Sequence, residues 1–394
     1  MRSECEDQKI LRNAPKPQKG AFFFVFMRCD SIIKIIEDWA PKSIAWEKDN
    51  VGLQVGSLQR EVTNILLCLD VNEDVVNEAI KLKCNLIISH HPLLFKPLKK
   101  IDVGKDQHSK LVEKLIKKDI TVFSAHTNLD FTKDGVSFQL AKKLGLKNQK
   151  FLLNLSSNQY KISVFVPVKF ADKVANAMHE AGAGIIGEYS NCSFRTTGIG
   201  TFKGSEKSNP KVGLKNKLET VEEIKIEVLA NSFDTDKIIT AMKKAHPYEE
   251  AAYDVYVLAN KDVNHGMGVI GNLEKELSDK QFLNLVSKSL KIKNFRFARG
   301  SKAKINKVAV CGGSGSDLLD TAIKSGADAF VTADVKYHTF QDAEKKILLI
   351  DAGHYETEIH SLDEIKNKIE KSISEKIKVF KYKGSTNPIV FYNK

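Results

Sequence analysis

The sequence predicts an α/β protein in which two separated halves form a three-layer α/β main domain and a ferredoxin-like α+β domain is inserted between them. Three observations support this prediction. Apolar strands alternate with amphipathic helices in residues 62–146, the same alternation returns in residues 307–392, and residues 160–258 follow another order. Such alternation is typical of βαβ units, in which helices cover a parallel sheet. The length of 394 residues is too great for one ordinary core, which also favours several domains.

Each half of the main domain contains repeats of strand and helix. In the first half, apolar runs predict strands at 62–71, 85–89 and 120–125, and amphipathic stretches predict helices at 73–83, 108–118 and 135–144. In the second half, the same patterns predict strands at 307–311, 327–332, 347–351 and 389–392, and helices at 317–325 and 359–375.

The middle segment has the order β-α-β-β-α-β, which is that of a ferredoxin-like fold. Its strands are predicted at 160–168, 194–202, 224–229 and 253–258, and its helices at 171–181 and 235–244. We therefore assign residues 27–150 and 266–394 to the main domain and residues 151–265 to the insert. Residues 1–26 are expected to form an N-terminal extension without fixed structure.

The charge and the composition exclude several classes of function. The formal net charge is +12, and lysine supplies most of it, as in the helical run 110–118. Lysines spread along a helix are typical of a solvated face. Nucleic-acid sites prefer arginine forks, so the charge argues against a nucleic-acid partner and favours a small anionic substrate. No apolar run approaches the ~18 residues of a membrane helix.

The cysteines indicate a reducing compartment. The chain has six cysteines and no Cys-x-x-Cys pair, so it offers neither a disulfide frame nor a zinc finger. We therefore expect a cytoplasmic protein.

Metal-binding side chains follow the predicted strands. In an open α/β sheet, sites lie just beyond the carboxyl ends of the strands. His90 and His91 follow one strand, His126 and Asp130 another, and His354 and Glu358 a third. A fourth loop, after the strand at 327–332, carries Asp334, Lys336 and His338. Since five of the ten histidines lie in these four loops, we expect the loops to build one site.

The ligand types favour a pair of divalent ions. Imidazole and carboxylate ligands together suit zinc, iron or manganese. The proposed ligands are three histidines and two carboxylates, which exceed the three protein ligands of one tetrahedral catalytic site. They fit two ions at ~3.5–4 Å with one bridging carboxylate. The plainer alternative is that each histidine is a hydrogen-bonded loop residue. The proposed ligands are His90, His91, Asp130, His354 and Glu358.

Three motifs together resemble a known family. These are Ser-His-His-Pro-Leu at 89–93, Ala-His-Thr-Asn-Leu-Asp at 125–130 and Gly-His-Tyr-Glu-Thr-Glu at 353–358. They resemble the NGG-interacting-factor-three-like dinuclear metal-centre hexameric proteins, also called GTP cyclohydrolase 1 type 2 homologs. The similarity runs from about residue 27 to residue 392, and the first 26 residues have no counterpart in it.

The resemblance carries expectations about metals, subunits and the insert. It implies two ions per chain, with His91 and Asp130 on one, His90 and His354 on the other, and Glu358 between them. It implies that His126 lines the site, that the insert is similar to PII or CutA proteins, and that the chain assembles as a homohexamer.

Two further groups of residues are candidates for substrate binding or proton transfer. Gly313, Ser314 and Gly315 follow a strand and open a helix, so their backbone N–H groups are candidates for binding an anion. A tight structural turn is the alternative, because the loop lacks the lysine of a P-loop. Lys336 is a candidate phosphate contact and His338 a proton carrier, although both also fit a polar helix start.

These observations lead to two hypotheses about function. In the first, the chain is a metal-dependent hydrolase that acts on a nucleotide or a related phosphorylated compound, either by C–N cleavage as in a GTP cyclohydrolase or as a phosphoesterase. His126 and His338 would then move protons. In the second, it is a metal-binding or small-molecule-sensing regulatory assembly without turnover. The sequence does not single out the substrate, the native metal or the role of the insert.

Overall fold

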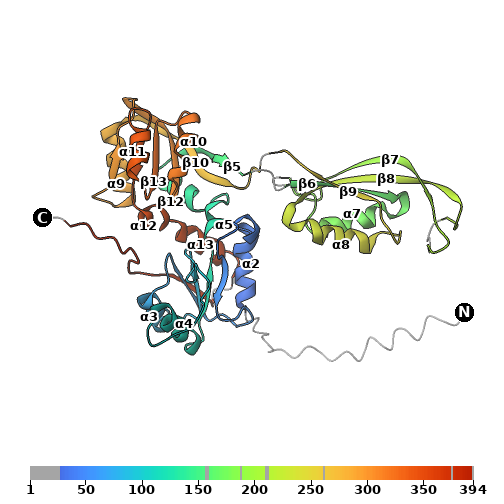
Figure 1. The fold of residues 1–394 in the computed structure, drawn as a ribbon, viewed down its shortest axis with the longest axis horizontal. Coiled ribbons are helices and arrows are strands. Elements are labelled where there is room, and N and C mark those ends of the chain that lie inside the picture. Colours follow the sequence, from blue (N-terminus) through green and yellow to red (C-terminus); the bar gives the residue numbers. More distant parts are fainter. Residues whose placement is uncertain are drawn as a thin grey trace, which may run out of the picture.

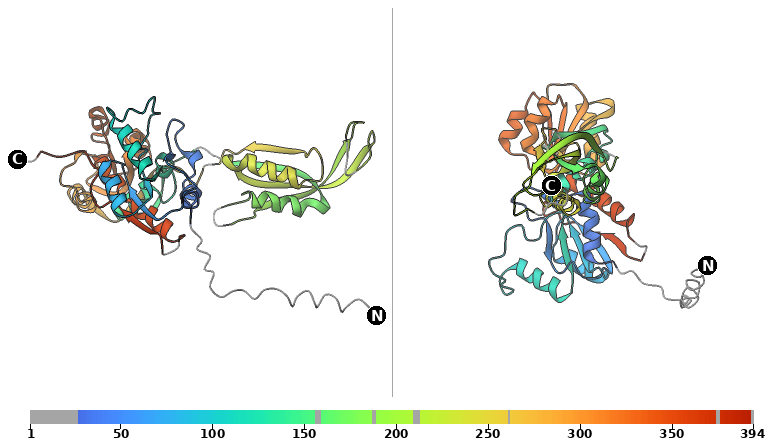
Figure 2. Two further views of the ribbon diagram at one scale, coloured as in Figure 1. Left: turned by 90° about the horizontal axis from the view of Figure 1, so that it is seen from below. Right: turned by 90° about the vertical axis from the view of Figure 1, so that its right-hand side faces the viewer.

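The computed structural model describes residues 27–155, 159–186, 189–208, 213–260, 262–373 and 376–392. The predicted extension at 1–26 lies outside the described residues. Within those ranges, no helix is both long and apolar enough to span a membrane. The described chain forms three sheets, two of which lie in one body while the third forms a separate lobe (Figures 1 and 2).

The first sheet has five strands in the order β1-β4-β3-β2-β15. β15, β2, β3 and β4 are parallel neighbours, and β1 pairs antiparallel with β4. Helices cover both faces of this sheet. Successive residues of β2 alternate between the two apolar clusters: Ile65 and Leu67 pack on one face, and Leu66 and Cys68 on the other. The strands are β1 (Gly52–Val55), β2 (Asn64–Cys68), β3 (Leu86–Ser89), β4 (Thr121–Ser124) and β15 (Lys378–Lys381). The helices are α2 (Cys29–Trp39) and α13 (Ser361–Glu370) on one face, and α3 (Glu73–Lys81) and α4 (Gln107–Lys117) on the other.

The second sheet has six strands in the order β11-β14-β13-β12-β10-β5. β12, β13 and β14 are parallel, while β5, β10 and β11 pair antiparallel with their neighbours. The strands are β5 (Lys147–Asn154), β10 (Gly266–Ser278), β11 (Arg296–Ala298), β12 (Lys304–Ser314), β13 (Ala329–Ala333) and β14 (Leu348–Asp351). The helices are α6 (Val136–Lys143) and α9 (Asp279–Leu290) on one face, and α10 (Leu319–Lys324) and α11 (Tyr337–Ala343) on the other.

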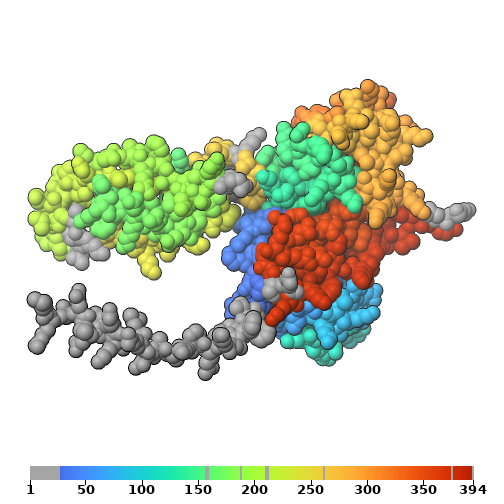
Figure 3. Space-filling model, turned by 180° about the vertical axis from the view of Figure 1, so that it is seen from behind, coloured from blue at the N-terminus to red at the C-terminus, as the bar shows by residue number. Residues whose placement is uncertain are grey.

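The third sheet is the predicted β-α-β-β-α-β unit. Its antiparallel strands have the order β7-β8-β6-β9, and its two helices pack on the sheet through an apolar cluster. Figure 3 shows this unit as a lobe beside the main body. The elements are β6 (Gln159–Pro167), α7 (Ala171–Glu180), β7 (Ser193–Lys203), β8 (Leu218–Asn231), α8 (Thr235–Ala245) and β9 (Tyr253–Val257). The predicted fold class is confirmed. The main domain has two sheets, and the C-terminal half adds β15 to the sheet that is otherwise formed by the N-terminal half.

Local signals in the sequence set the helix starts. α3 begins after Asn72, whose side chain accepts a hydrogen bond from the Val75 N–H at 3.0 Å. α9 begins with a capping box in which Ser278 and Gln281 satisfy each other's backbone N–H groups. Such caps satisfy amides that would otherwise lack a partner in the first turn.

Two predictions near the C-terminus are wrong. Residues 389–392 form no strand: they pair with no strand in the described part of the chain, and Val390 is 89% exposed. The last strand is instead β15, which pairs with β2. The helix predicted at 359–375 is shorter, since α13 ends at Glu370, and the short helix α12 (His354–Glu358) precedes it.

Candidate metal centre

The predicted ligands come from both sheets and meet between them. β3 ends at Ser89, so His90 and His91 lie just beyond its carboxyl end. β4 leads into the short helix α5 (Thr127–Asp130), and β14 leads into α12. Figure 1 shows α5 and α12 between the two sheets. The carboxyl edges of the two sheets therefore bring their loops to one place.

The Glu358 carboxylate lies among three imidazoles. Its Oε2 is 3.1 Å from His91 Nε2, and its Oε1 is 3.1 Å from His354 Nε2 and 3.7 Å from His90 Nε2. The Nε2 atoms of His91 and His354 are 3.3 Å apart. On the far side, His90 Nε2 is 3.5 Å from Asp130 Oδ1. The five predicted ligands thus form one cluster.

Each imidazole of the cluster is held through its Nδ1 atom. A carbonyl or carboxylate oxygen only accepts, so in each case the Nδ1 carries a hydrogen, and Nε2 is the nitrogen that the neutral imidazole offers to a cation. This is how metal-binding histidines are commonly oriented. The pairs are His90 with the Ala125 carbonyl at 2.8 Å, His91 with Asp70 at 2.8 Å, His126 with Asp49 at 2.9 Å and His354 with Asp334 at 2.6 Å.

Among the residues that the structure describes, three buried atoms of the cluster find no hydrogen-bond partner: His90 Nε2, Asp130 Oδ1 and Glu358 Oε2. His90 is 0% exposed and Glu358 3% exposed, so water does not reach these atoms freely. Buried polar atoms are rarely left without a partner unless an ion or water completes them. The residues therefore fit a divalent ion. Two groups have ligand atoms that all lie within 4.8 Å of one another: His90 and His91 with His126, and His91 with His354 and Glu358.

The electrostatics show that the cluster carries protons when it holds no cation. Burial lowers the pKa of His91, but the neighbouring carboxylates of Asp70 and Glu358 outweigh it and raise the value to about 10. The pKa of His354 is raised to about 9, because Glu358 and Asp334 outweigh burial in the same way. Burial raises the pKa of Asp130 to about 7, against the opposing charge of His90. A cation would have to displace these protons.

The contacts leave the sharing of ligands open. The family resemblance implies that His91 pairs with Asp130 and His90 with His354. Among these four ligands, His90 Nε2 is instead 3.5 Å from Asp130 Oδ1, and His91 Nε2 is 3.3 Å from His354 Nε2. Glu358 lies between the imidazoles in both arrangements. The pairing of ligands therefore stays a prediction.

His126 lies at the rim of the cluster and is held by a buried carboxylate. Its ring centroid is 5.2 Å from that of His90 and 5.4 Å from that of His91. Burial raises the pKa of Asp49, but hydrogen bonds from His126 and Thr127 outweigh it and lower the value to about 2. Asp49 is therefore ionised at neutral pH and keeps the hydrogen of His126 on Nδ1.

The carboxylates of Asp49 and Asp70 were not predicted from the sequence as parts of the site. Asp70 was placed inside a strand at 62–71, but β2 ends at Cys68, so Asp70 in fact follows a carboxyl end. Ligands are sought just beyond the carboxyl ends of strands, which is how His90 was found. With the correct end of β2, the same rule would have pointed to Asp70. Asp49 lies in a turn before β1 and gives no such signal.

The glycine-rich loop supports Glu358 instead of facing an open anion site. The N–H of Gly313 donates to Thr357 Oγ1 at 3.0 Å, and that of Gly315 donates to Thr332 Oγ1 at 3.0 Å. Gly313 has a φ of +62°, and a Cβ there would overlap Glu358 Oε1. Because both amides have partners within the protein, the geometry favours the tight structural turn that was the alternative for residues 313–315.

Lys336 and His338 lie at the start of α11 and are exposed. His338 Nδ1 is 3.0 Å from Gln341 Oε1 on the same helix. In the described part of the chain, no hydrogen bond or ion pair joins either side chain to the cluster. Their roles in phosphate binding and proton transfer stay predictions.

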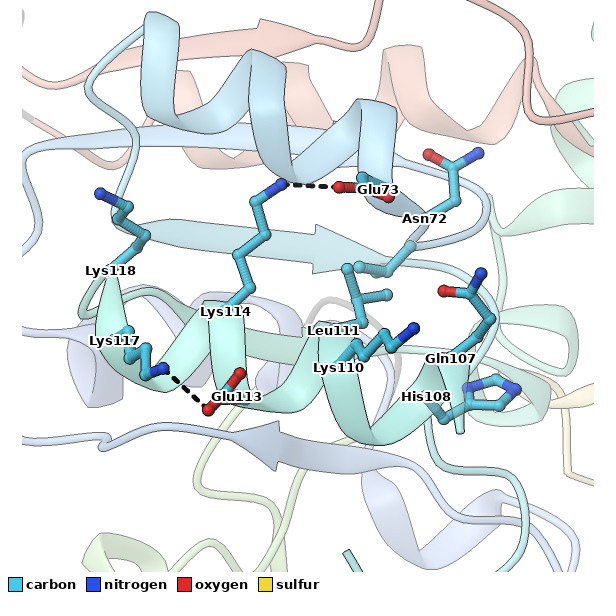
Figure 4. A pocket seen from close by; sticks show the side chains of 11 residues that line it. Asn72, Glu73, Gln107, His108, Lys110, Leu111, Glu113, Lys114, Lys117 and Lys118 are labelled. Carbon is cyan, nitrogen blue, oxygen red and sulfur yellow. Dashed lines mark hydrogen bonds and ion pairs between the residues drawn. The ribbon is translucent and has the colours of Figure 1, made fainter. Parts of the chain in front are cut away.

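The lysine-rich helix α4 lines a groove against α3. Figure 4 shows Lys114 reaching Glu73, at 3.0 Å, and Lys117 reaching Glu113, at 2.8 Å. Lys110, on the same helix, and Lys118, directly after its end, are exposed. Lysines that are solvated or paired with carboxylates fit the predicted solvated helix surface, so we assign no ligand to this groove.

Comparisons with known proteins give the chain its relatives. The sequence pattern of the Duf34/NIF3 (NGG1p interacting factor 3) family matches residues 27–388. A GTP cyclohydrolase 1 type 2 homolog of Halalkalibacterium halodurans is 41% identical over 348 residues, which are 88% of this chain and 93% of the relative. A protein of the same description from Listeria monocytogenes is 45% identical over 323 residues, 81% of this chain and 86% of the relative. The crystal structure of a Bacillus cereus protein related to NIF3 has a TM-score of 0.80 and 40% identity, and covers 93% of this chain and 100% of that chain.

Proposed function

Because the chain belongs to the Duf34/NIF3 (NGG1p interacting factor 3) family, we propose that it holds two divalent metal ions and acts as a metal-dependent hydrolase on a nucleotide or a related phosphorylated compound. The observation that carries the proposal is the buried Glu358 carboxylate, which has an imidazole Nε2 3.1 Å from each of its two oxygens. A carboxylate in this position can bridge two cations. The metal (zinc, iron or manganese) and a homohexamer remain predictions.

The donor set supports the proposed cations through its chemistry. His90, His91 and His354 would supply imidazole nitrogens, and Asp130 and Glu358 carboxylate oxygens. When bound, such a pair of ions lowers the pKa of a water to ~7 and polarises a phosphoryl or carbonyl oxygen. The residues around the ions would orient the ligands, exclude water and accept the proton.

His126 is the proposed proton acceptor. Its Nδ1–H donates to Asp49, so its Nε2 has a free lone pair. The ionised Asp49 would stabilise the imidazolium that forms when Nε2 takes a proton, since opposite charges 2.9 Å apart attract strongly in a half-buried site. Thr127 donates to the same carboxylate from its N–H at 3.1 Å and from its hydroxyl at 2.5 Å, which keeps Asp49 in place.

The substrate class is proposed from charge and from the relatives. The net charge of +12 favours an anionic substrate. Relatives described as GTP cyclohydrolase 1 type 2 homologs suggest a guanine nucleotide, in which a C–N bond of the base would be hydrolysed. Lys336 and His338, which follow the carboxyl end of β13, are the proposed contacts for phosphate and for a second proton.

The proposal is tested by metal analysis and turnover together, with His126→Gln as the informative variant. Wild-type protein should retain two ions per chain and hydrolyse at least one nucleotide in a panel with manganese, zinc or iron(II). The variant should retain the same metal content but lose about 100-fold or more in kcat, because it lacks the proton acceptor. If the variant loses metal, His126 is a ligand instead. Tight metal retention without any turnover by the wild type would favour the non-catalytic regulatory function.

Metal affinity should rise with pH. The raised pKa values of His91 (about 10) and His354 (about 9) mean that both imidazoles are protonated in the metal-free protein at pH 7. A cation binds only the unprotonated Nε2, so it competes with protons, and this competition weakens as pH rises toward those values. The apparent affinity for manganese should increase from pH 6 to pH 8 by about tenfold per pH unit for each proton displaced. Calorimetry in two buffers of different ionisation enthalpy counts the protons, and an affinity independent of pH would contradict the prediction.

A further inference from the structure

The C-terminal residues 382–391, which we call the C-terminal strap, run across the edge of the molecule that carries the cluster. The strap continues from β15, and the Tyr382 N–H still donates to the Leu67 carbonyl at 2.8 Å. It then leaves the five-stranded sheet and ends on the side of the body opposite the insert (Figures 1 and 2). Ile389 and Phe391 line a cavity of about 230 Å³ together with His354. The strap therefore touches both halves of the main domain.

Thr386 contacts the carboxylate that holds His91. Its Oγ1 donates to Asp70 Oδ2 at 2.7 Å, while Asp70 Oδ1 accepts from His91 Nδ1 at 2.8 Å. The Asp70 side chain is 44% exposed, so packing alone does not fix its rotation. The Thr386 hydroxyl holds Oδ2 of Asp70 by its hydrogen bond and thereby orients Oδ1 toward His91.

Asn387, the next residue of the strap, contacts the helix that carries the other ligands. Its Nδ2 donates to Glu356 Oε1 at 2.9 Å, and its Oδ1 accepts from the Ile389 N–H at 3.0 Å, which fixes the orientation of the amide. Glu356 lies on α12 between His354 and Glu358, and its carboxylate packs over Gly353. Two adjacent residues of the strap thus contact both sides of the cluster: one binds the carboxylate behind His91, and the other binds the helix that carries His354 and Glu358.

We propose that two residues of the C-terminal strap support the metal centre: Thr386 is a positioning residue for His91 that acts through Asp70, and Asn387 steadies α12 through Glu356. The proposal rests on the proposed metal site but does not depend on catalysis. Removing such a contact should weaken metal binding and change the ligand field, because the carboxylate behind a ligating imidazole sets its orientation and basicity.

The test uses Co²⁺ as the probe, because its visible absorption reports the geometry of its ligands. Thr386→Val removes the hydroxyl with little change in shape, and it should bind Co²⁺ about 3- to 10-fold more weakly than the wild type, with altered absorption bands. Thr386→Ser retains the hydroxyl and should restore both properties. Val390→Ala, at an 89% exposed position of the same strap, should match the wild type. Thr386→Ala serves as a second variant if the valine variant does not fold.

A double-mutant cycle shows whether Thr386 acts through Asp70. Asp70→Ala alone should weaken Co²⁺ binding by about 10- to 100-fold, and adding Thr386→Val should then cost nothing more. Wild-type affinity and absorption in Thr386→Val would overturn the proposal, and so would an undiminished effect in the Asp70→Ala background. Failure of the wild type to bind Co²⁺ would overturn the metal site itself, which is a different result.

Discussion

Replacing Glu358 with glutamine should abolish the two-ion centre. The variant keeps the size of the side chain but removes the charge that lies 3.1 Å from both His91 Nε2 and His354 Nε2. A neutral amide is a poor bridging ligand, so we expect the variant to lose at least one of the two proposed ions and about 100-fold or more in affinity for the other. Elemental analysis of the purified protein and a chelator competition measure both effects.

The matched control for this variant is Glu344→Gln. Glu344 is an exposed residue at the end of α11, and within the described residues no hydrogen bond or ion pair joins it to the cluster. The Glu344→Gln variant loses the same charge outside the proposed ligand set, so its metal content and any hydrolysis should equal those of the wild type. Unchanged metal content and turnover in Glu358→Gln, in a protein with wild-type folding, would exclude a metal centre built on this carboxylate.

Replacing Gly313 with alanine should displace Glu358 without unfolding the chain. The new Cβ would overlap Glu358 Oε1 and lie 3.3 Å from His354 Nε2. The buried carboxylate must then move, and metal affinity should fall by at least about tenfold, since ligand geometry sets affinity. The left-handed backbone at φ +62° adds a stability cost of about 1–2 kcal/mol for alanine.

Gly145→Ala separates these two effects. Gly145 has a φ of +76°, and a Cβ there would meet no atom of the described residues within 4 Å, apart from its chain neighbours. Both variants therefore carry the same kind of backbone cost, and only Gly313→Ala meets the carboxylate. Thermal melts should show similar losses of stability, whereas metal titration should show a defect in Gly313→Ala alone. Equal metal affinity in the two variants would contradict the supporting role of the glycine-rich loop.

The site could be predicted because its ligands follow a simple rule of parallel sheets. The strands before His90 and His354 are short, apolar and buried on both faces, so their carboxyl ends are visible in the sequence. The rule placed all five proposed ligands near one another, and the structure brings them together. The rule could not give the carboxylate partners of the imidazoles. Asp49 belongs to a turn, and the strand before Asp70 was predicted to end three residues too late, so Asp70 fell inside it.

The division of the main domain into two sheets could not be predicted from local patterns. Strand and helix alternation reveals βαβ units, but it does not say which sheet a strand joins. β15 pairs with β2, and Lys378 N–H donates to Asn64, 314 positions earlier in the chain. β10 was missed because Gly266, Gly268 and Gly271 interrupt its apolar pattern, although the absent side chains allow the close approach of β5 and β12.

The union of ligands from two distant segments has a consequence for biosynthesis. His91 and His354 are 263 positions apart, and the chain between them includes the whole lobe formed by β6 to β9. A nascent polypeptide that has emerged from the ribosome only as far as that lobe has no complete set of donors. The proposed cations would therefore find all their ligands only after the chain has been made as far as Glu358.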